Sequence, residues 1–234
     1  MKGKGVASKN PRKTVAALGQ GTRLSDQAYI GILAVLFDRK LPAGAFVSQA
    51  QLVELTGVPV GPLRDALRVL EAEGVLTIHP HTGIQFVKPG LELTRSTFQF
   101  RGIIEAAAVA IYAEIGSESE IREIKARHRK VEADLKHDGV TPEILREIEE
   151  LEEVLHGAIV SCLNNPLIDT SYRRIRNYLK LMRLERKMTV PLLMRSLREH
   201  ILIIDACANR DADAAASALQ AHFAAALQRS LGLY

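Results

Sequence analysis

Two residue types that can bind a metal or move a proton lie one helical turn apart in the stretch ELEEVLHGAI, at Glu152 and His156. At about 100° per residue, Ile148, Leu151 and Leu155 form one apolar stripe of this helical segment. Glu152 projects into the extension of that stripe, and His156 lies just beyond it. A buried carboxylate needs a partner, so this turn predicts a buried polar site rather than a solvated charged face.

Two later histidines lie on apolar stripes of their own helical segments. His200 shares a stripe with Leu197 and Ile201, and His222 shares one with Leu219. Each of these histidines alone is more often a core residue than a ligand. Together with the acid–histidine pair, they place three imidazoles and one carboxylate on the inner faces of three helices. Neutral imidazole and carboxylate suit a divalent metal ion, with Zn favoured over Ni, Mn or Fe.

The other histidines and the cysteines give weaker signals. His128 and His137 lie among charged residues and are predicted to be solvated. Cys162 and Cys207 fall on apolar helical faces, which indicates core thiols in a reducing cytosol rather than a disulfide. No run of about 18 apolar residues is present, and the start has no apolar signal segment, so we expect a cytoplasmic protein without a membrane span.

Composition and pattern favour a mainly α fold. Of 234 residues, 47% are hydrophobic and only 5% are aromatic, a balance that leans toward helices. Beyond Leu93 the helical segments are separated by short breaks, which predicts an antiparallel all-helical bundle at 94–234. Residues 90–93 are the predicted linker. The predicted helices cover residues 94–115, 118–137, 142–163, 166–188, 192–208 and 211–231.

The first third has the element order of a winged helix-turn-helix, here at residues 24–89. Three helical segments precede two short apolar stretches, VLTIH and IQFVK, which flank the turn PHTG as a β-hairpin. In the third helix Arg64 and Arg68 lie four residues apart and point outward together, as in a helix that reads a major groove. For Arg68, an ion pair with a neighbouring acid is an equal alternative. The predicted DNA-contacting residues are Ser48, Gly61, Pro62, Arg64, Arg68, His79, His81, Thr82 and Gly83.

A basic segment precedes this unit. Residues 1–23 carry six Lys and Arg residues and no acid, and they lack a periodic apolar pattern. This composition predicts a disordered basic arm. The arm is either a solubilising tail or a non-specific contact to DNA phosphates.

The stretch LPAGAFVSQAQLVELTGVPVGPLRDALRVLEAEGVLTIHPHTGIQFV resembles the DNA-binding domain of the GntR family of bacterial regulators. That family has a Pro-Gly turn, a short helix, Gly-Val, a Ser-Arg-Thr-Pro-Val-Arg-Glu-Ala-Leu helix and a Gly-Leu-rich hairpin. Two departures stand out, since the segment 59–61 replaces the family's Ser-Arg-Thr with Pro-Val-Gly, and His81 replaces its wing arginine. The positions on the pattern are Pro62, Arg64, Ala66, Leu67, Leu70, Glu71, Gly74 and Gly83.

The helical region is similar to the FCD effector domain of the FadR-type branch of that family. The family pattern contains an Arg-x-x-x-Glu helix, here Arg101 and Glu105, and an Asp-x-x-Phe-His stretch, here EEVLH, followed by two later histidines. The resemblance implies that Arg101 binds the carboxylate of an effector, although an ion pair with Glu105 fits the spacing equally well. It also implies a set of metal ligands with Glu152 in place of the usual Asp. These ligands are Glu152, His156, His200 and His222.

Together, these resemblances imply a metabolite-responsive transcription factor and not an enzyme. We expect it to bind a palindromic double-stranded DNA operator as a homodimer, because paired recognition helices read two half-sites. A small organic acid at the metal site would be the effector, and release of a repressor would be the default response. The alternative is a metal-dependent hydrolase or other metalloenzyme that uses three histidines and a carboxylate to activate water. A regulator that senses the metal itself is a third alternative.

Overall fold

The computed structural model describes residues 23–184 and 186–232. These residues divide into two compact units, one ending at Pro89 and the other beginning at Gly90. Of the predicted basic arm, all but Arg23 lies outside the described residues. None of the described helices combines the length and the apolar character that a membrane crossing requires.

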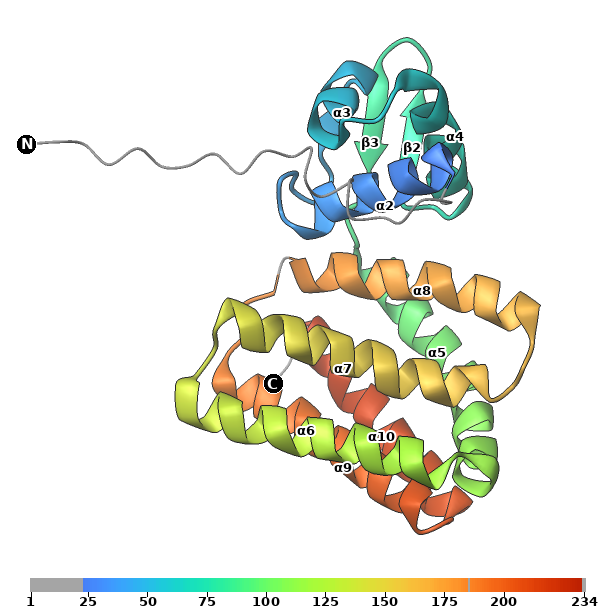
Figure 1. The fold of residues 1–234 in the computed structure, drawn as a ribbon, viewed down its shortest axis with the longest axis vertical. Coiled ribbons are helices and arrows are strands. Elements are labelled where there is room, and N and C mark those ends of the chain that lie inside the picture. Colours follow the sequence, from blue (N-terminus) through green and yellow to red (C-terminus); the bar gives the residue numbers. More distant parts are fainter. Residues whose placement is uncertain (1–22, 185, 233–234) are drawn as a thin grey trace, which may run out of the picture. The chain divides into compact units, whose positions relative to one another are not determined.

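The N-terminal unit is a winged helix-turn-helix, as predicted (Figure 1). Its elements are α2 (Leu24–Phe37), β1 (Phe46–Val47), α3 (Gln49–Thr56), α4 (Val60–Ala72), β2 (Leu76–His79) and β3 (Gly83–Phe86). The strands form an antiparallel sheet in the order β1-β3-β2, and Ile78 pairs with Ile84 in the hairpin. The sequence pattern did not predict β1, because a strand of two residues has no alternation to detect.

Local signals explain the helix pair of this unit. Ser48 caps α3 through a capping box: its side chain accepts from the Gln51 amide at 3.2 Å, and its own amide donates to the Gln51 side chain at 2.8 Å. Gly57 ends α3 in the left-handed conformation, at φ 71°. Helix α4 then buries one face, as predicted, and leaves the opposite face to solvent. Its buried residues are Leu63, Ala66, Leu67 and Leu70.

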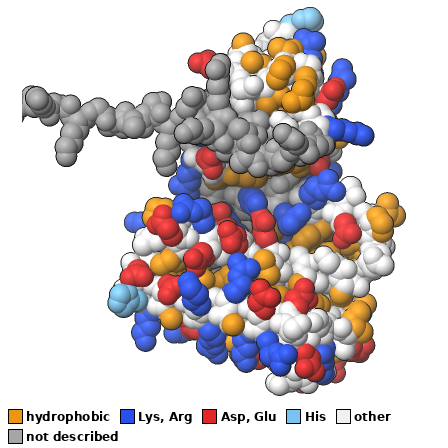
Figure 2. Space-filling view, viewed as in Figure 1, with side chains coloured by type: hydrophobic (Ala, Val, Ile, Leu, Met, Phe, Trp, Pro, Cys, Tyr) orange, Lys and Arg blue, Asp and Glu red, His pale blue; other side chains and the backbone are white. Residues whose placement is uncertain are grey.

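The C-terminal unit is the predicted antiparallel helical bundle, with six helices among the described residues (Figure 1). They are α5 (Leu91–Ile115), α6 (Glu118–Asp138), α7 (Pro142–Ser161), α8 (Pro166–Leu184), α9 (Val190–Ala208) and α10 (Ala212–Ser230). Helix α10 packs against α5 and α9, α6 packs against α7 and α9, and α8 contacts α5 and α7. Acidic and basic side chains intermingle on the visible outer face of this unit (Figure 2). The apolar stripes of its helices are buried, for example at Leu151, Leu155 and Leu197.

Two predicted boundaries in this unit are wrong. Helix α5 begins at Leu91, so most of the predicted linker at 90–93 is helical. Glu92 favours this earlier start, because a carboxylate in the first turn interacts well with the helix dipole. Helix α8 ends at Leu184 rather than at residue 188. Both cysteines are free, and Cys207 is buried as predicted, whereas Cys162 is only half-buried.

Candidate metal centre

Helices α7, α9 and α10 bring together the four residues predicted as metal ligands. One nitrogen or oxygen atom of each residue lies within 4.8 Å of the corresponding atoms of the others. The three histidines are buried, and the Glu152 side chain is 12% exposed. Three imidazoles and one carboxylate at this spacing can hold a divalent cation. The four residues are Glu152, His156, His200 and His222.

Two ring nitrogens in this cluster lack a hydrogen-bond partner. Nε2 of His156 and Nε2 of His200 are both buried, and neither makes a hydrogen bond to a described residue. The Glu152 carboxylate is close to both, with Oε1 3.3 Å from Nε2 of His200 and Oε2 4.0 Å from Nε2 of His156. Because buried polar atoms are nearly always paired in folded proteins, these two nitrogens indicate a site that a ligand completes.

Carboxylates outside the cluster orient two of the rings through their Nδ1 atoms. Nδ1 of His156 donates to Oε2 of Glu105 on α5 at 2.6 Å. Nδ1 of His222 donates to Oε2 of Glu199 at 2.9 Å, and the Arg229 guanidinium holds both Glu199 oxygens, at 2.8 and 2.6 Å. A bond of this kind leaves the Nε2 lone pair free for a metal. The sequence pattern included Glu105 but gave no signal for Glu199 or Arg229.

His128 is buried beside this cluster, and its prediction as a solvated residue is wrong. The side chain is fully buried, with Nε2 3.2 Å from Nδ1 of His200. Charged sequence neighbours obscured the pattern, because Ile124 and Val131 are both buried on α6 and His128 lies on their stripe at helical spacing. His137, in contrast, is 87% exposed, as predicted.

Burial and ion pairing set the charge states of the cluster. Burial lowers the pKa of His200 well below its usual value and also lowers the pKa of His222, so both rings are neutral at physiological pH. Burial opposes ionisation of Glu152, but the guanidinium of Arg183 beside it holds the pKa of the carboxyl well below its usual value. The site therefore offers neutral imidazole and ionised carboxylate, the protonation states in which these groups bind metal.

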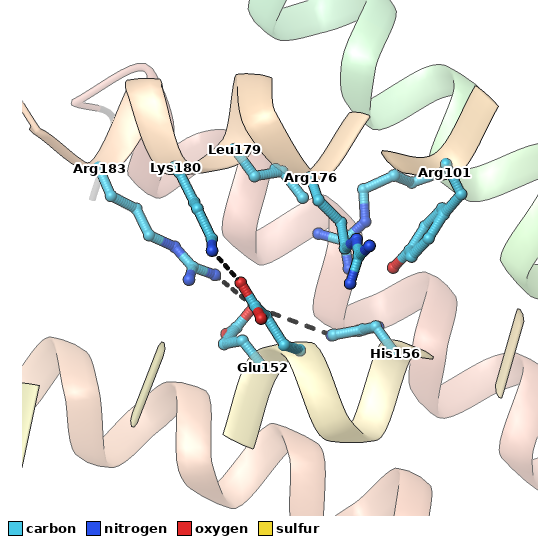
Figure 3. A pocket seen from close by; sticks show the side chains of 9 residues that line it. Arg101, Glu152, His156, Arg176, Leu179, Lys180 and Arg183 are labelled. Carbon is cyan, nitrogen blue, oxygen red and sulfur yellow. Dashed lines mark hydrogen bonds and ion pairs between the residues drawn. The ribbon is translucent and has the colours of Figure 1, made fainter. Parts of the chain in front are cut away.

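A small cavity adjoins the cluster between α7 and α8 (Figure 3). Its volume is about 20 Å³, which holds one water molecule and is too small for an organic acid. Figure 3 shows Arg176 and Arg183 of α8 extending toward α7, where Glu152 and His156 line the opposite wall. The cavity therefore places cations from α8 against one edge of the cluster of Glu152 and the three histidines.

Arg101 forms the ion pair with Glu105 and also lines this cavity. Its Nε donates to Oε1 of Glu105 at 2.6 Å, and its guanidinium carbon lies 4.4 Å from the centroid of the Phe223 ring. The hydroxyl of Tyr172 donates to the same Glu105 oxygen at 3.2 Å. The sequence left two roles open for Arg101, an effector contact and an ion pair with Glu105. These roles are compatible, because Glu105 holds the guanidinium at the wall of the cavity.

The predicted DNA contacts of the helix pair lie on α4 and at the helix N-termini. Arg64 and Arg68 are both exposed on the outer face of α4. Nε of Arg64 donates to Oε1 of Gln49 at 3.3 Å. Nη1 of Arg68 lies 3.7 Å from Oδ1 of Asp65. This is the ion pair that the sequence allowed as an alternative to a DNA contact. The other predicted contacts, at the N-termini of α3 and α4, are Ser48, Gly61 and Pro62.

The predicted contacts of the wing form the tip between β2 and β3. His81 is left-handed at φ 64°, and the Thr82 amide donates to the carbonyl of His79 at 3.1 Å, which closes the turn. Gly83 has no room for a side chain, since a Cβ there would lie 2.7 Å from the Phe46 ring and 2.8 Å from a backbone carbonyl oxygen of β1. His81 and Thr82 are exposed at the tip, whereas Gly83 serves the fold of the wing.

The described residues combine a winged helix-turn-helix, a fold that many DNA-binding proteins use, with an all-helical unit that contains a buried cluster of three histidines and a carboxylate. The FCD domain family matches residues 96–225, so the chain belongs to the GntR-type regulators of the FadR branch, which carry this domain. It is 21% identical over 197 residues to the HTH-type transcriptional regulator YdhC of Bacillus subtilis (strain 168), over 84% of this chain and 86% of that protein.

Two solved structures have a similar fold. E. coli McbR/YncC has a TM-score of 0.76 and 17% identity, over 91% of this chain and 99% of that chain. A transcriptional regulator of GntR type from Rhodococcus sp. RHA1 has a TM-score of 0.73 and 20% identity, over 91% of this chain and 100% of that chain. Both similarities extend over the two units of the chain.

Proposed function

We propose that this regulator is a metal-dependent repressor that releases a near-palindromic operator when a small organic acid binds beside the metal. The observation that carries this proposal is a pair of buried Nε2 atoms, in His156 and His200, that make no hydrogen bond to a described residue. Both rings lie together with Glu152 and His222. Packing alone does not account for such atoms, because a buried unpaired nitrogen costs free energy. The adjoining arginine-lined cavity supports an anionic effector.

The four proposed ligand residues fit a divalent ion in chemistry, and His200, His222 and Glu152 also fit it in protonation state. Three imidazoles and one carboxylate are a set typical of Zn, and Ni, Mn or Fe also accept it. When bound, such an ion supplies a fixed positive charge and coordination positions that water or a carboxylate can occupy. On the protein side, the bonds to Glu105 and Glu199 hold the His156 and His222 rings in orientation.

Metal binding by the full chain tests this site directly. After chelation and reloading with zinc, we expect one tightly held ion per chain by elemental analysis. His156→Ala and His200→Ala should each lower zinc affinity by at least about tenfold. The matched control is His137→Ala on α6, whose exposed side chain should leave zinc affinity unchanged. Wild-type affinity in both ligand variants would rule out the proposed site.

A small organic acid is the proposed effector because cations dominate the wall of the cavity. Arg101, Arg176 and Arg183 line it together with Lys180, against two acids of α7. The volume of about 20 Å³ requires the α8 side chains to move aside when an acid enters. An acid that contacts both α8 and the metal would therefore change how α8 packs on α7, which is a structural basis for a response.

A thermal-shift screen of small mono- and dicarboxylic acids on zinc-loaded protein tests the effector. At one hundred times its Kd, a ligand of the folded state stabilises by about 2.7 kcal/mol, which shifts Tm by several degrees. Arg176→Met should abolish the shift and keep the metal, whereas Arg173→Met, exposed on the same helix, should keep both. A screen without any shift would count against the effector. Turnover of an acid would instead support the metalloenzyme alternative.

Helix α4 is the proposed recognition helix, with Arg64 at guanine edges or phosphates of each half-site. Operators can be selected from random duplexes with wild-type protein. Arg64→Ala should then weaken operator binding by about 1–3 kcal/mol, or about 5- to 150-fold. Arg68→Ala should cost less, because Arg68 is paired with Asp65. Intact operator binding by Arg64→Ala at physiological salt would refute the assignment.

The effector can change operator affinity only through its different affinities for two arrangements of the dimer. Couplings of about 1–3 kcal/mol, or about 5- to 150-fold, are typical. We expect acid titrated at fixed zinc to lower the anisotropy of a labelled operator. If zinc titrated at fixed acid produced the whole response, the metal itself would be the signal, as in the metal-sensing alternative.

A further inference from the structure

His128 on α6 lies outside the proposed ligand set but contacts one of its members. Its Nε2 is 3.2 Å from Nδ1 of His200, and the two ring planes meet at 70° with centroids 5.3 Å apart. Its Nδ1 is 2.7 Å from the carbonyl oxygen of Ile124, one turn earlier on the same helix. Since the side chain is fully buried, both ring nitrogens rely on these partners.

This hydrogen-bond chain assigns a proton to each ring. A carbonyl oxygen only accepts, so Nδ1 of His128 carries a proton and donates it to Ile124. In the neutral ring, Nε2 then has the lone pair and accepts from Nδ1 of His200. The neutral His200 ring therefore has its own lone pair at Nε2, the buried atom that lies 3.3 Å from Glu152 without a hydrogen bond. A backbone carbonyl thus determines, through two imidazoles, which nitrogen of His200 is free.

We propose that His128 is a positioning residue that fixes the tautomer and the ring plane of His200 for metal binding. This inference rests on the metal site of the proposed function. The other two ligand histidines have carboxylate partners, Glu105 and Glu199, whereas His128 is a neutral acceptor. A third carboxylate at this point would need another buried cation, because an uncompensated buried charge is costly. His128 meets the same geometric need without adding charge.

Two substitutions separate this role from packing. In His128→Gln the amide oxygen can still accept from Nδ1 of His200, whereas His128→Leu fills similar space without an acceptor. We expect His128→Leu to weaken zinc binding by about 10- to 100-fold, measured by competition with a chromophoric chelator, with one ion per chain still bound at saturation. His128→Gln should stay within about threefold of wild type. His137→Leu, at an exposed position of α6, is the control.

A tautomer measurement tests the same inference without a variant. Long-range ¹H–¹⁵N spectra of the metal-free wild type should show the proton of His200 on Nδ1 and none on Nε2.

The visible bands of the cobalt-loaded protein should change in His128→Leu and persist in His128→Gln. A proton on Nε2 of His200, wild-type zinc affinity in the Leu variant, or equal losses in both variants would each overturn the role of His128.

The outcomes for His128 and for the proposed function are distinguishable. Zinc binding by the wild type with unchanged affinity in His128→Leu would remove only the positioning role. Failure of the wild type to bind zinc would overturn the metal site and this inference with it. If His128→Leu does not fold, the wild-type spectra still decide the tautomer of His200.

Discussion

Replacing Arg183 by Met should destabilise the metal-free protein and spare the metal-loaded protein. Arg183 forms an ion pair with Glu152, and the two side chains are 18% and 12% exposed. Removing one partner of a fully buried pair costs about 3–5 kcal/mol. The residual exposure of this pair reduces the expected loss to about 2–3 kcal/mol. At about 2–4 °C per kcal/mol for a protein of this size, Tm should fall by about 4–12 °C in the presence of a chelator.

With zinc bound, the ion supplies the positive charge that Glu152 loses in Arg183→Met, so the loss should be about 1 kcal/mol or less. Thermal unfolding followed by circular dichroism, with chelator or with excess zinc, measures both values. The control is Lys180→Met, since the Lys180–Glu153 pair is 33% and 37% exposed and should contribute about 1 kcal/mol or less in either condition. Equal losses with and without zinc would refute a contact between Glu152 and the ion. No loss in chelator would refute the stabilising role of the Arg183 pair.

Gly83→Ala should lower the free energy of unfolding of the N-terminal unit by about 1–3 kcal/mol, because the added Cβ would lie 2.7 Å from the Phe46 ring at a φ of 155°. In the same urea titrations Gly61→Ala, with open space around its Cβ, should be neutral or stabilising by up to about 1 kcal/mol. A second prediction concerns pH, since burial lowers the pKa of His200 and His222 in the folded, metal-free protein. Below the unfolded-state histidine pKa of about 6.5, the unfolded chain therefore binds more protons than the folded chain. The free energy of unfolding should stay constant above that pH. It should fall as the pH drops below it, by up to about 1.4 kcal/mol per pH unit for each histidine. Urea midpoints at pH 7.5 and 5.5 give the sign, and a higher midpoint at pH 5.5 would contradict it.

Helical periodicity explains why the clustering of Glu152 with three histidines could be predicted from the sequence. His156, His200 and His222 each lie at the apolar stripe of a helix, and a bundle turns these stripes toward one interior. Polar residues that face inward from neighbouring helices therefore tend to meet in that interior. Capping and turn residues predicted the winged helix in the same local way, as Ser48 and Gly57 show at the two ends of α3.

The features that the sequence did not reveal depend on contacts between distant segments. Glu152 meets Arg183 on another helix, and no local spacing indicates which side chain of α8 will reach α7. The bidentate ion pair between Arg229 and Glu199 also joins two helices, so local spacing does not indicate it either. For His128 a local signal did exist, in the stripe that it shares with other buried residues of α6. Its charged sequence neighbours lie on the opposite face of α6. They do not indicate whether His128 is exposed, because one face of a helix can be buried while the other is in solvent.

The charges around the cluster are balanced before any metal binds. Each carboxylate has an arginine partner, in the pairs Glu105–Arg101, Glu152–Arg183 and Glu199–Arg229. Since the His200 and His222 rings are neutral, a divalent ion would add two positive charges to a buried site that is close to neutral. Uncompensated buried charge is costly, which favours a bound anion as the companion of the ion. By linkage, acid should then raise zinc affinity by the same factor as zinc raises acid affinity. Calorimetric titration of an acid from the screen into zinc-loaded and chelated protein measures this factor, and equal affinities would show that metal and effector sites are independent.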